Sequence, residues 1–423
     1  SNTAPGTPGN TGCLTNVGTA HGASVENPGE QNDSTAFFED TQRQLKQLAE
    51  FASVDFDIIP KVLTVTAGTR HFRFTNTFTG SVTSSFGCYE AGVIPGGCVA
   101  DATDLNAGNL SATESGSKSR GNITWHVTPD AMVYATWSQG FRPGAFNRQE
   151  ASVAAYIDGP DGKPQFAIPN YYKSDQLTNK EIGWKTEWFD HRFQWNGAVY
   201  QENWNNVQIG FFDPAETGNL AFGDNGQDFR IRGVETSLVA RLFQGLTVQG
   251  GASWNSSVQT NSPNLIDTNP SSVNFGKPIT EKCNSSGLNC VPISNLFGPE
   301  GSPSANSPPI QFNLRARYDW TMDTYNAFVQ FGGQHVGHSF TQSGSNPAIS
   351  AKGVTTTLLR FENPAYSDYD ASAGVAKDNW NVHLFSQNLF NKNVDLFTNT
   401  AQFVVAATPL RPRIIGIDFG YKF

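Results

Sequence analysis

The sequence has few charged residues and no long apolar run. Asp, Glu, Lys and Arg make up 15% of the 423 residues. No run approaches the ~18 apolar residues of a membrane-spanning helix, which excludes that architecture. A formal net charge of −9, with no basic stripe, argues against a nucleic-acid partner. The 31 Phe, 11 Tyr and 9 Trp are too many aromatic residues for an intrinsically disordered chain.

Motifs for catalysis and for metal binding are also missing from the sequence. The seven His follow neither HExxH nor the Cys-rich spacing of zinc sites. There is no GxSxG, and no Gly-rich segment precedes a helix that could hold a phosphate. We therefore expect no enzyme, no cofactor and no resident metal. His335 and His338 lie near the outer end of a predicted strand, where a metal or metal chelate could contact them, but solvated histidines are the simpler interpretation.

Cysteine is scarce, and the five residues fall in three places. Cys88 and Cys98 share one Gly-, Pro-, Asn- and Ser-rich segment, and Cys283 and Cys290 share another. We predict two loop disulfides, Cys88–Cys98 and Cys283–Cys290, in an oxidising compartment. Free thiols in these loops are the alternative. Cys13 is left over, which indicates a partner outside this chain.

No signal peptide opens the chain, because the first residues, SNTAPGTPGNTG, are typical of a loop. For an exported protein this predicts either a processed form or a missing front portion.

The chain is instead rich in alternating apolar and polar residues. In the terminal segment 414–423, one face of an extended strand carries Ile415, Ile417, Phe419, Tyr421 and Phe423, and the opposite face is small or charged. In outer-membrane barrels the last strand closes the cylinder with its apolar face toward lipid. A polar residue at every second position also explains a mean hydropathy of −0.39 in a membrane protein.

The same pattern predicts an all-β fold, a transmembrane antiparallel β-barrel. About thirteen strands are expected, most of them reaching the ~9–11 residues that cross a bilayer at a tilt. They lie near 47–58, 62–75, 117–128, 131–141, 174–189, 192–207, 227–242, 246–259, 309–320, 324–338, 366–377, 380–391 and 410–423. Short turns alternate with long polar loops, which predicts short periplasmic turns and long extracellular loops. We assign residues 1–46 to an extracellular loop segment and residues 47–423 to the barrel.

Aromatic residues cluster beside the predicted short turns. They are Trp125, Trp188, Phe193, Phe243, Trp320, Tyr325 and Trp380. Amphipathic rings concentrate at a membrane–water interface, so this pattern predicts a periplasmic girdle. A soluble β-sandwich is the alternative, but its loops should be short at both ends.

Several segments resemble the TonB-dependent outer-membrane receptor family. Residues 132–147, MVYATWSQGFRPGAFN, resemble the family's tyrosine strand followed by GFRPG. Residues 179–187 (NKEIGWKTE), 232–236 (RGVET) and 385–392 (FSQNLFNK), together with the terminal Phe423, follow in the family's order. The resemblance covers nearly all of the chain from about Ser34 onward.

The resemblance implies a 22-strand barrel plugged by an N-terminal domain that a TonB box precedes. We find neither a TonB box nor a plug here, so the predicted strands correspond to about the last 13 of 22. Such a sheet should not close neatly, and its first strand should be an exposed edge.

The resemblance also implies energy-coupled uptake of a bulky, scarce solute, most often a ferric siderophore. Its implied partners are outer-membrane lipid, a ferric chelate or other small ligand, and the TonB complex acting through the plug. A passive porin, a surface ligand-binding barrel, and uptake of cobalamin or carbohydrate are the alternatives. A secreted soluble β-protein is a third possibility.

Four residues are candidates for ligand binding at the outer vestibule. Arg142 and Arg148 flank the outer end of one predicted strand, and Tyr171 and Tyr172 precede the next. Guanidinium planes and phenol rings suit a carboxylate- or catecholate-bearing iron chelate. The alternative for Arg142 is structural: it anchors the rim to loop carbonyls while Pro143 and Gly144 turn the chain.

Overall fold

The structure, a computed structural model, describes residues 37–84, 103–106, 108–147, 157–166, 168–212, 221–284, 286–293, 297–342, 347–349, 355–358, 360–401 and 404–423. No helix in this described part of the chain is long and apolar enough to cross a membrane.

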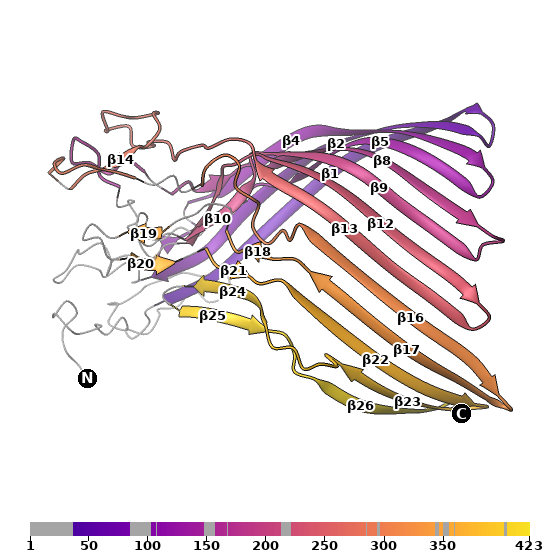
Figure 1. Ribbon diagram of the computed structural model, residues 1–423. Helices are drawn as coiled ribbons and strands as arrows, with labels where there is room; N and C mark the ends of the chain where they lie inside the picture. Colours follow the sequence, from indigo (N-terminus) through magenta and orange to yellow (C-terminus); the bar gives the residue numbers. More distant parts are fainter. Residues whose placement is uncertain are drawn as a thin grey trace, which may run out of the picture.

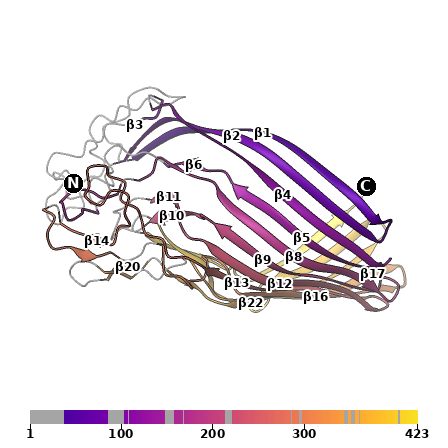
Figure 2. The same cartoon turned by 90° about the horizontal axis from the view of Figure 1, so that it is seen from above.

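One antiparallel sheet dominates the molecule (Figures 1 and 2). Its thirteen main strands pair in chain order, and the short strand β3 (Thr103–Asp104) adds to β2. The main strands are β1 Phe37–Ile59, β2 Leu63–Ser84, β4 Leu110–Thr128, β5 Ala131–Arg142, β8 Asp175–Trp188, β9 Phe193–Asn205, β12 Phe229–Phe243, β13 Leu246–Gln259, β16 Ile310–Met322, β17 Tyr325–Val336, β22 Tyr366–Lys377, β23 Trp380–Gln387 and β26 Ile414–Tyr421. The predicted all-β antiparallel fold is confirmed.

The two ends of the sheet differ as predicted. Tight turns join β1 to β2, β4 to β5, β8 to β9, β12 to β13, β16 to β17 and β22 to β23 at one end, on the right in Figure 1. The β12–β13 turn needs a glycine: Gly245 has φ +88, and a Cβ there would collide with the carbonyl oxygen of Asp319. Every other connection between consecutive main strands is long.

The long loops lie at the opposite end and contain small hairpins (Figure 1). These pair β6 Ala145–Phe146 with β7 Tyr171–Tyr172, β10 Gln208–Phe212 with β11 Ala221–Asn225, β14 Glu281–Lys282 with β15 Val291–Pro292, β18 Ser339–Phe340 with β21 Glu362–Asn363, β19 Pro347–Ile349 with β20 Thr355–Leu358, and β24 Asp395–Ala401 with β25 Val404–Pro409.

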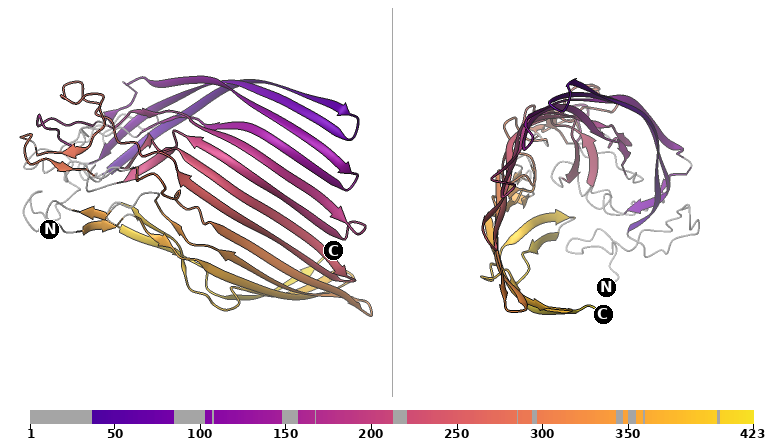
Figure 3. Two further views of the ribbon diagram at one scale, coloured as in Figure 1. Left: turned by 45° about the horizontal axis from the view of Figure 1, so that its top comes forward. Right: turned by 90° about the vertical axis from the view of Figure 1, so that its right-hand side faces the viewer.

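The sheet is a curved, open wall (Figure 3, right). Within the described residues, β1 pairs along one side with β2, β26 pairs along one side with β23, and these two outer strands do not pair with each other. The prediction of an unclosed sheet with β1 as an edge is therefore met by the described strands.

The first strand begins earlier than predicted. β1 starts at Phe37, so residues 37–46 belong to this strand and not to the loop segment 1–46; residues 1–36 lie outside the described part. The sequence does not predict a strand in this segment because its residues are mostly polar and do not alternate with apolar ones. Pairing with β2 holds them extended, from Phe37 opposite Ser84 onward.

The inner face of the wall is identified by the loop hairpins, which lie inside its curve (Figure 3, right). Phe78 of β2 packs against Phe146 of β6, so Phe78 points inward. Residues directly opposite on paired strands share a face, and the register carries this assignment around the sheet. Tyr134, Glu181 and Glu235 then lie on the inner face, and Ile123, Ile182 and Val199 on the outer one.

The outer face is apolar along its middle. One row of paired residues crosses seven strands without a polar side chain: Val65, Ile123, Ala135, Ile182, Val199, Val234 and Trp254. Near the tight turns, Trp125, Trp188 and Phe243 are exposed, as a girdle requires. The other predicted girdle residues, Phe193, Trp320, Tyr325 and Trp380, are half-buried. On β26 the predicted apolar face is also exposed, with Ile417 at 71% and Phe419 at 70%.

A lysine at the middle of this face should destabilise the barrel. We expect Ile182→Lys to cost about 2–4 kcal/mol of folding free energy, because it places an ammonium in hydrocarbon. The measurement is urea unfolding in lipid vesicles. Ser237→Lys, on the inner face, is the matched control and should change stability by less than about 1 kcal/mol. Equal losses in the two variants would contradict the assignment of faces.

Candidate functional site

Three long loops pack together beyond the ends of the strands. Ile157 and Phe166 of the β5–β8 loop, Phe222 of the β9–β12 loop, and Leu265, Ile279 and Phe297 of the β13–β16 loop form one buried apolar cluster. Each of these side chains is at most 5% exposed. Burial of this size holds the loops in place as one cap, which we name the three-loop cap.

Buried amide side chains form hydrogen bonds within and between the β5–β8 and β13–β16 loops. Gln165 donates through Nε2 to the carbonyl oxygens of Asp158 (3.3 Å) and Glu281 (2.9 Å). Gln259 donates to the carbonyl oxygen of Gly298 at 2.8 Å. Backbone carbonyls buried away from water need such donors, so these two glutamines stabilise a loop conformation that has little regular secondary structure.

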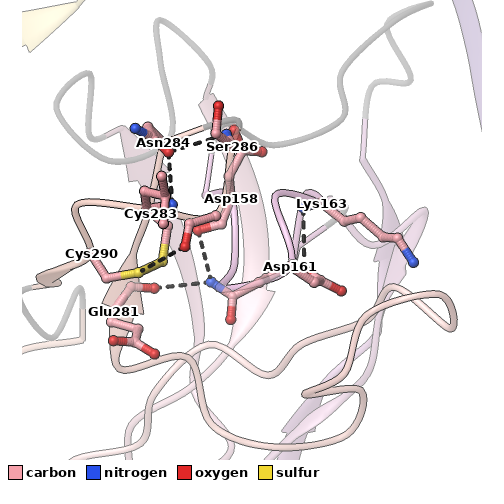
Figure 4. Close-up of a disulfide and its surroundings, with 11 residues drawn as sticks. Asp158, Asp161, Lys163, Glu281, Cys283, Asn284, Ser286 and Cys290 are labelled. Carbon is pink, nitrogen blue, oxygen red and sulfur yellow. Dashed lines mark hydrogen bonds between the residues drawn. A yellow bond between two sulfur atoms is a disulfide. The ribbon is translucent and has the colours of Figure 1, made fainter.

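The predicted Cys283–Cys290 disulfide is present in the cap (Figure 4). The backbone N–H of Cys283 donates to the carbonyl oxygen of Asp158 at 2.7 Å, which joins the β13–β16 loop to the β5–β8 loop. Burial raises the pKa of the Asp158 carboxyl. Cys13, Cys88 and Cys98 lie outside the described residues, so Cys88–Cys98 stays a prediction.

Arg142 is part of a hydrogen-bonded cluster at the outer end of β5. Its backbone N–H and its Nε donate to the two carboxylate oxygens of Asp175, at 3.0 and 2.7 Å, and its Nη2 pairs with the same carboxylate. Asp175 is 1% exposed and also accepts from Trp204 Nε1 at 2.9 Å. Arg142 Nη2 donates to the carbonyl oxygen of Gln208 at 3.1 Å, and the guanidinium lies 4.7 Å from the Trp204 ring. These contacts match the structural alternative for Arg142, in which the residue anchors the rim.

The two predicted tyrosines have different surroundings. Tyr171 packs edge-on against Phe146, and its hydroxyl donates to Glu114. Burial, together with this bond to Glu114, raises the pKa of Tyr171. Tyr172 points instead into a cavity, where its ring packs over Gly223. Arg148 lies outside the described residues.

The cavity has a volume of about 520 Å³ and lies on the inner side of the loop end. It brings Arg142 and Tyr172 together with residues of β1 and the β9–β12 loop. The lining residues are Glu39, Arg43, Arg142, Phe146, Asn147, Tyr172, Gln208, Ile209, Gly210, Phe222 and Gly223. We name it the vestibule cavity. Guanidinium groups, a phenol and aromatic rings can together hold an anionic, partly aromatic ligand.

Sequence reasoning missed Arg43 and Gln208. Arg43 lies in the segment read as loop, and only its strand pairing with Phe78 brings it to the cavity. Gln208 holds the wall in place through Nε2, which donates to the carbonyl oxygens of Pro143 and Lys173, both at 2.9 Å. Neither residue carries a local sequence signal, because each depends on a neighbour far along the chain.

The histidines do not form a metal site within the described residues. His335 Nδ1 lies 2.9 Å from Ser367 Oγ, and His338 packs edge-on against Phe340. In this part of the chain the three potential metal ligands that converge are Glu281, Cys283 and Cys290, and the disulfide occupies both cysteine sulfurs. Such a sulfur pair is a poor ligand set, because metals bind the thiolate.

Removing the Asp175 carboxylate should loosen the loop end of β5. We expect Asp175→Asn to weaken the pairing with Arg142 by about 1–3 kcal/mol. Hydrogen exchange of residues 140–146 and 204–208 should then rise on the order of tenfold. Gln176→Ala, at the exposed neighbouring position, is the control and should leave exchange unchanged. Equal exchange in Asp175→Asn and the wild type would remove the anchoring role.

Removing the disulfide should act on the cap alone. We expect Cys283→Ser with Cys290→Ser to cost about 2–3 kcal/mol of local stability, because a short loop is no longer closed. Limited proteolysis should nick residues 281–293 faster. The strands hold their own register, so the folded fraction should not change; unaltered nicking would show that the apolar cluster alone holds this loop.

Comparison with known proteins identifies the sheet. The family described as "TonB dependent receptor-like, beta-barrel" matches residues 8–391, most of the chain. The match explains the two unlike ends of the sheet and its exposed apolar face.

Solved structures of other proteins have the same fold as this chain. The ferric yersiniabactin uptake receptor of Yersinia pestis has a TM-score of 0.60 at 12% identity, with 90% of this chain and 46% of that chain covered. The siderophore receptor PiuA of Acinetobacter baumannii has a TM-score of 0.58 at 15% identity, covering 90% and 44%. The ferric-catecholate import receptor Fiu of E. coli K12 has a TM-score of 0.57 at 16% identity, with 90% of this chain and 45% of that chain covered. This chain spans less than half the length of these proteins. It belongs to the TonB-dependent receptor family, a family of receptors and not of enzymes, and it folds as an outer-membrane β-barrel.

Proposed function

We propose that this chain is the barrel of a receptor that takes up a ferric siderophore across the outer membrane. The observation that carries the proposal is the vestibule cavity, in which Arg43, Arg142 and Tyr172 line one space at the loop end of the barrel. The similar solved proteins named above are a ferric yersiniabactin uptake receptor, a ferric-catecholate import receptor and a siderophore receptor, which supports the same class of solute here.

The cavity suits the chemistry of an anionic iron chelate. Catecholate and carboxylate oxygens carry negative charge, and a guanidinium can donate two parallel hydrogen bonds to them. Arg43 is exposed, and its guanidinium lies 4.8 Å from the Phe78 ring. Phe146, Tyr172 and Phe222 supply aromatic surface for a catechol ring.

In this proposal Arg142 both anchors the rim and contacts the solute. Its Nε and Nη2 are used by Asp175 and Gln208, while its side chain is 49% exposed and still lines the cavity. Arg142 therefore presents the remaining donors from a fixed position. Tyr171, whose hydroxyl donates to Glu114, supports the wall and does not face the solute. Arg148 stays a candidate of the same chemistry on the adjoining loop.

Transport in this proposal needs a plug and the TonB complex, which would open a path when solute binds outside. Neutral carbohydrates are disfavoured as solutes because they lack the anionic oxygens that two arginines recognise. A passive porin is disfavoured because three long loops pack into one buried apolar cluster beyond the strand ends.

The test is growth of a strain in which the gene is deleted and then restored as wild type or as a variant. Restoration should rescue growth on one siderophore as the sole iron source. Arg43→Gln and Tyr172→Ala should each raise the concentration for half-maximal uptake of labelled iron on the order of tenfold, since each removes a direct contact. Lys173→Gln, an exposed neighbour outside the cavity, is the control.

Growth of the deletion strain on every siderophore tested, together with loss of growth on cobalamin or a carbohydrate, would overturn the iron assignment. Unchanged uptake in both cavity variants would instead place the solute elsewhere on the receptor.

A further inference from the structure

The outer face of the sheet contains a hollow that transport does not use. It has a volume of about 970 Å³ and lies over β2, β4, β5, β8, β9, β12 and the edge of β13. Its floor consists of small side chains, Ala67, Gly121 and Ala135. A Cβ built on Gly121 would meet no atom within 4 Å, so the space above it is open.

The hollow is apolar over β2, β4 and β5, and cationic over β8 and β12. Ile182 and Val199 belong to the apolar row, whereas Lys180, Gln201 and Arg232 form the next paired row toward the loops. Arg232 Nε donates to Gln201 Oε1 at 2.8 Å, which holds the guanidinium along the sheet. Among the described residues, no carboxylate pairs with Lys180 or Arg232.

These cations lie at the depth of a lipid headgroup. Lys180 is eight residues along β8 from Trp188, which marks the periplasmic girdle. At ~3.3 Å per residue and a tilt of about 40°, this is roughly 20 Å across the membrane. The apolar band of such barrels is ~25 Å tall, so Lys180 and Arg232 lie near its outer boundary. Arg230, two residues farther out on the same face of β12, adds a third exposed cation.

We propose that this hollow binds one phosphate-bearing lipid of the outer leaflet. An acyl chain lies over Ala67, Gly121 and Ala135, and the headgroup phosphate accepts hydrogen bonds from Lys180 and Arg232. The site lies on the face of the sheet opposite the vestibule cavity and does not depend on the proposed solute.

Charge and position favour a lipid over a protein partner. A protein segment would have to bring carboxylates to the edge of the hydrocarbon, where their desolvation is costly. A phosphate already resides at this depth, and the planar fork of Arg232 matches its oxygens. The small floor residues leave room for a methylene chain, which gains contact area without a hydrogen-bond requirement.

The test is native mass spectrometry of the full receptor, extracted in mild detergent and supplemented with a phosphorylated outer-leaflet glycolipid. The wild type should retain one lipid. Lys180→Gln with Arg232→Gln should lower retention on the order of tenfold, because two charge-assisted contacts are lost. Gly121→Leu should lower retention independently by filling the floor. Lys185→Gln removes the same charge from the inner face of β8 and should retain lipid as the wild type does.

Two outcomes would overturn the proposal. One is undiminished lipid retention in both the double variant and Gly121→Leu. For this outcome to count, all the proteins must be folded, which their shifted electrophoretic mobility before heating shows. The other is displacement of the lipid by millimolar inorganic phosphate, which would reveal an anion site without a role for the acyl chain. Retention of a dephosphorylated lipid at a strongly reduced level would support the phosphate contact.

Discussion

The structure depends on one constraint: backbone hydrogen bonds between neighbouring strands, in a fixed register, with side chains alternating between two faces. A shift of one residue would move Ile182 from the lipid face to the interior and bring Glu181 into hydrocarbon. The cost of a buried charge therefore protects the register of each strand. The same pairing holds polar segments extended, as in residues 37–46 of β1, which no side-chain pattern would predict.

The loop end is stabilised by different interactions. Its three loops have little regular structure, so they are held by a small apolar cluster, by buried glutamine amides and by one disulfide. Partners come from residues more than one hundred positions apart, as with Gln165 and Glu281. Because the cap rests on strands whose register is independent of it, its sequence can vary to suit a solute without loss of the barrel.

Arg142 shows how function and stability share one residue. The family resemblance marks the GFRPG segment, and sequence alone left Arg142 between solute binding and rim anchoring. The buried carboxylate of Asp175 explains why an arginine is suited there: a planar fork can satisfy the carboxylate and a carbonyl together. A lysine would lack that geometry. The exposed remainder of the guanidinium adds, together with Arg43, positive charge to the vestibule cavity.

The sequence by itself determined the fold class, the alternation of tight turns with long loops, the apolar face of the last strand and the Cys283–Cys290 pair. These are local features, since a two-residue period, turn residues and a short cysteine spacing need no distant partner. The tertiary structure alone decided where β1 begins, that Tyr171 is packed while Tyr172 lines the cavity, and that Arg43 joins Arg142 there. It also placed Lys180 and Arg232 in one row, because strand register, which depends on residues far apart in the chain, sets which side chains meet.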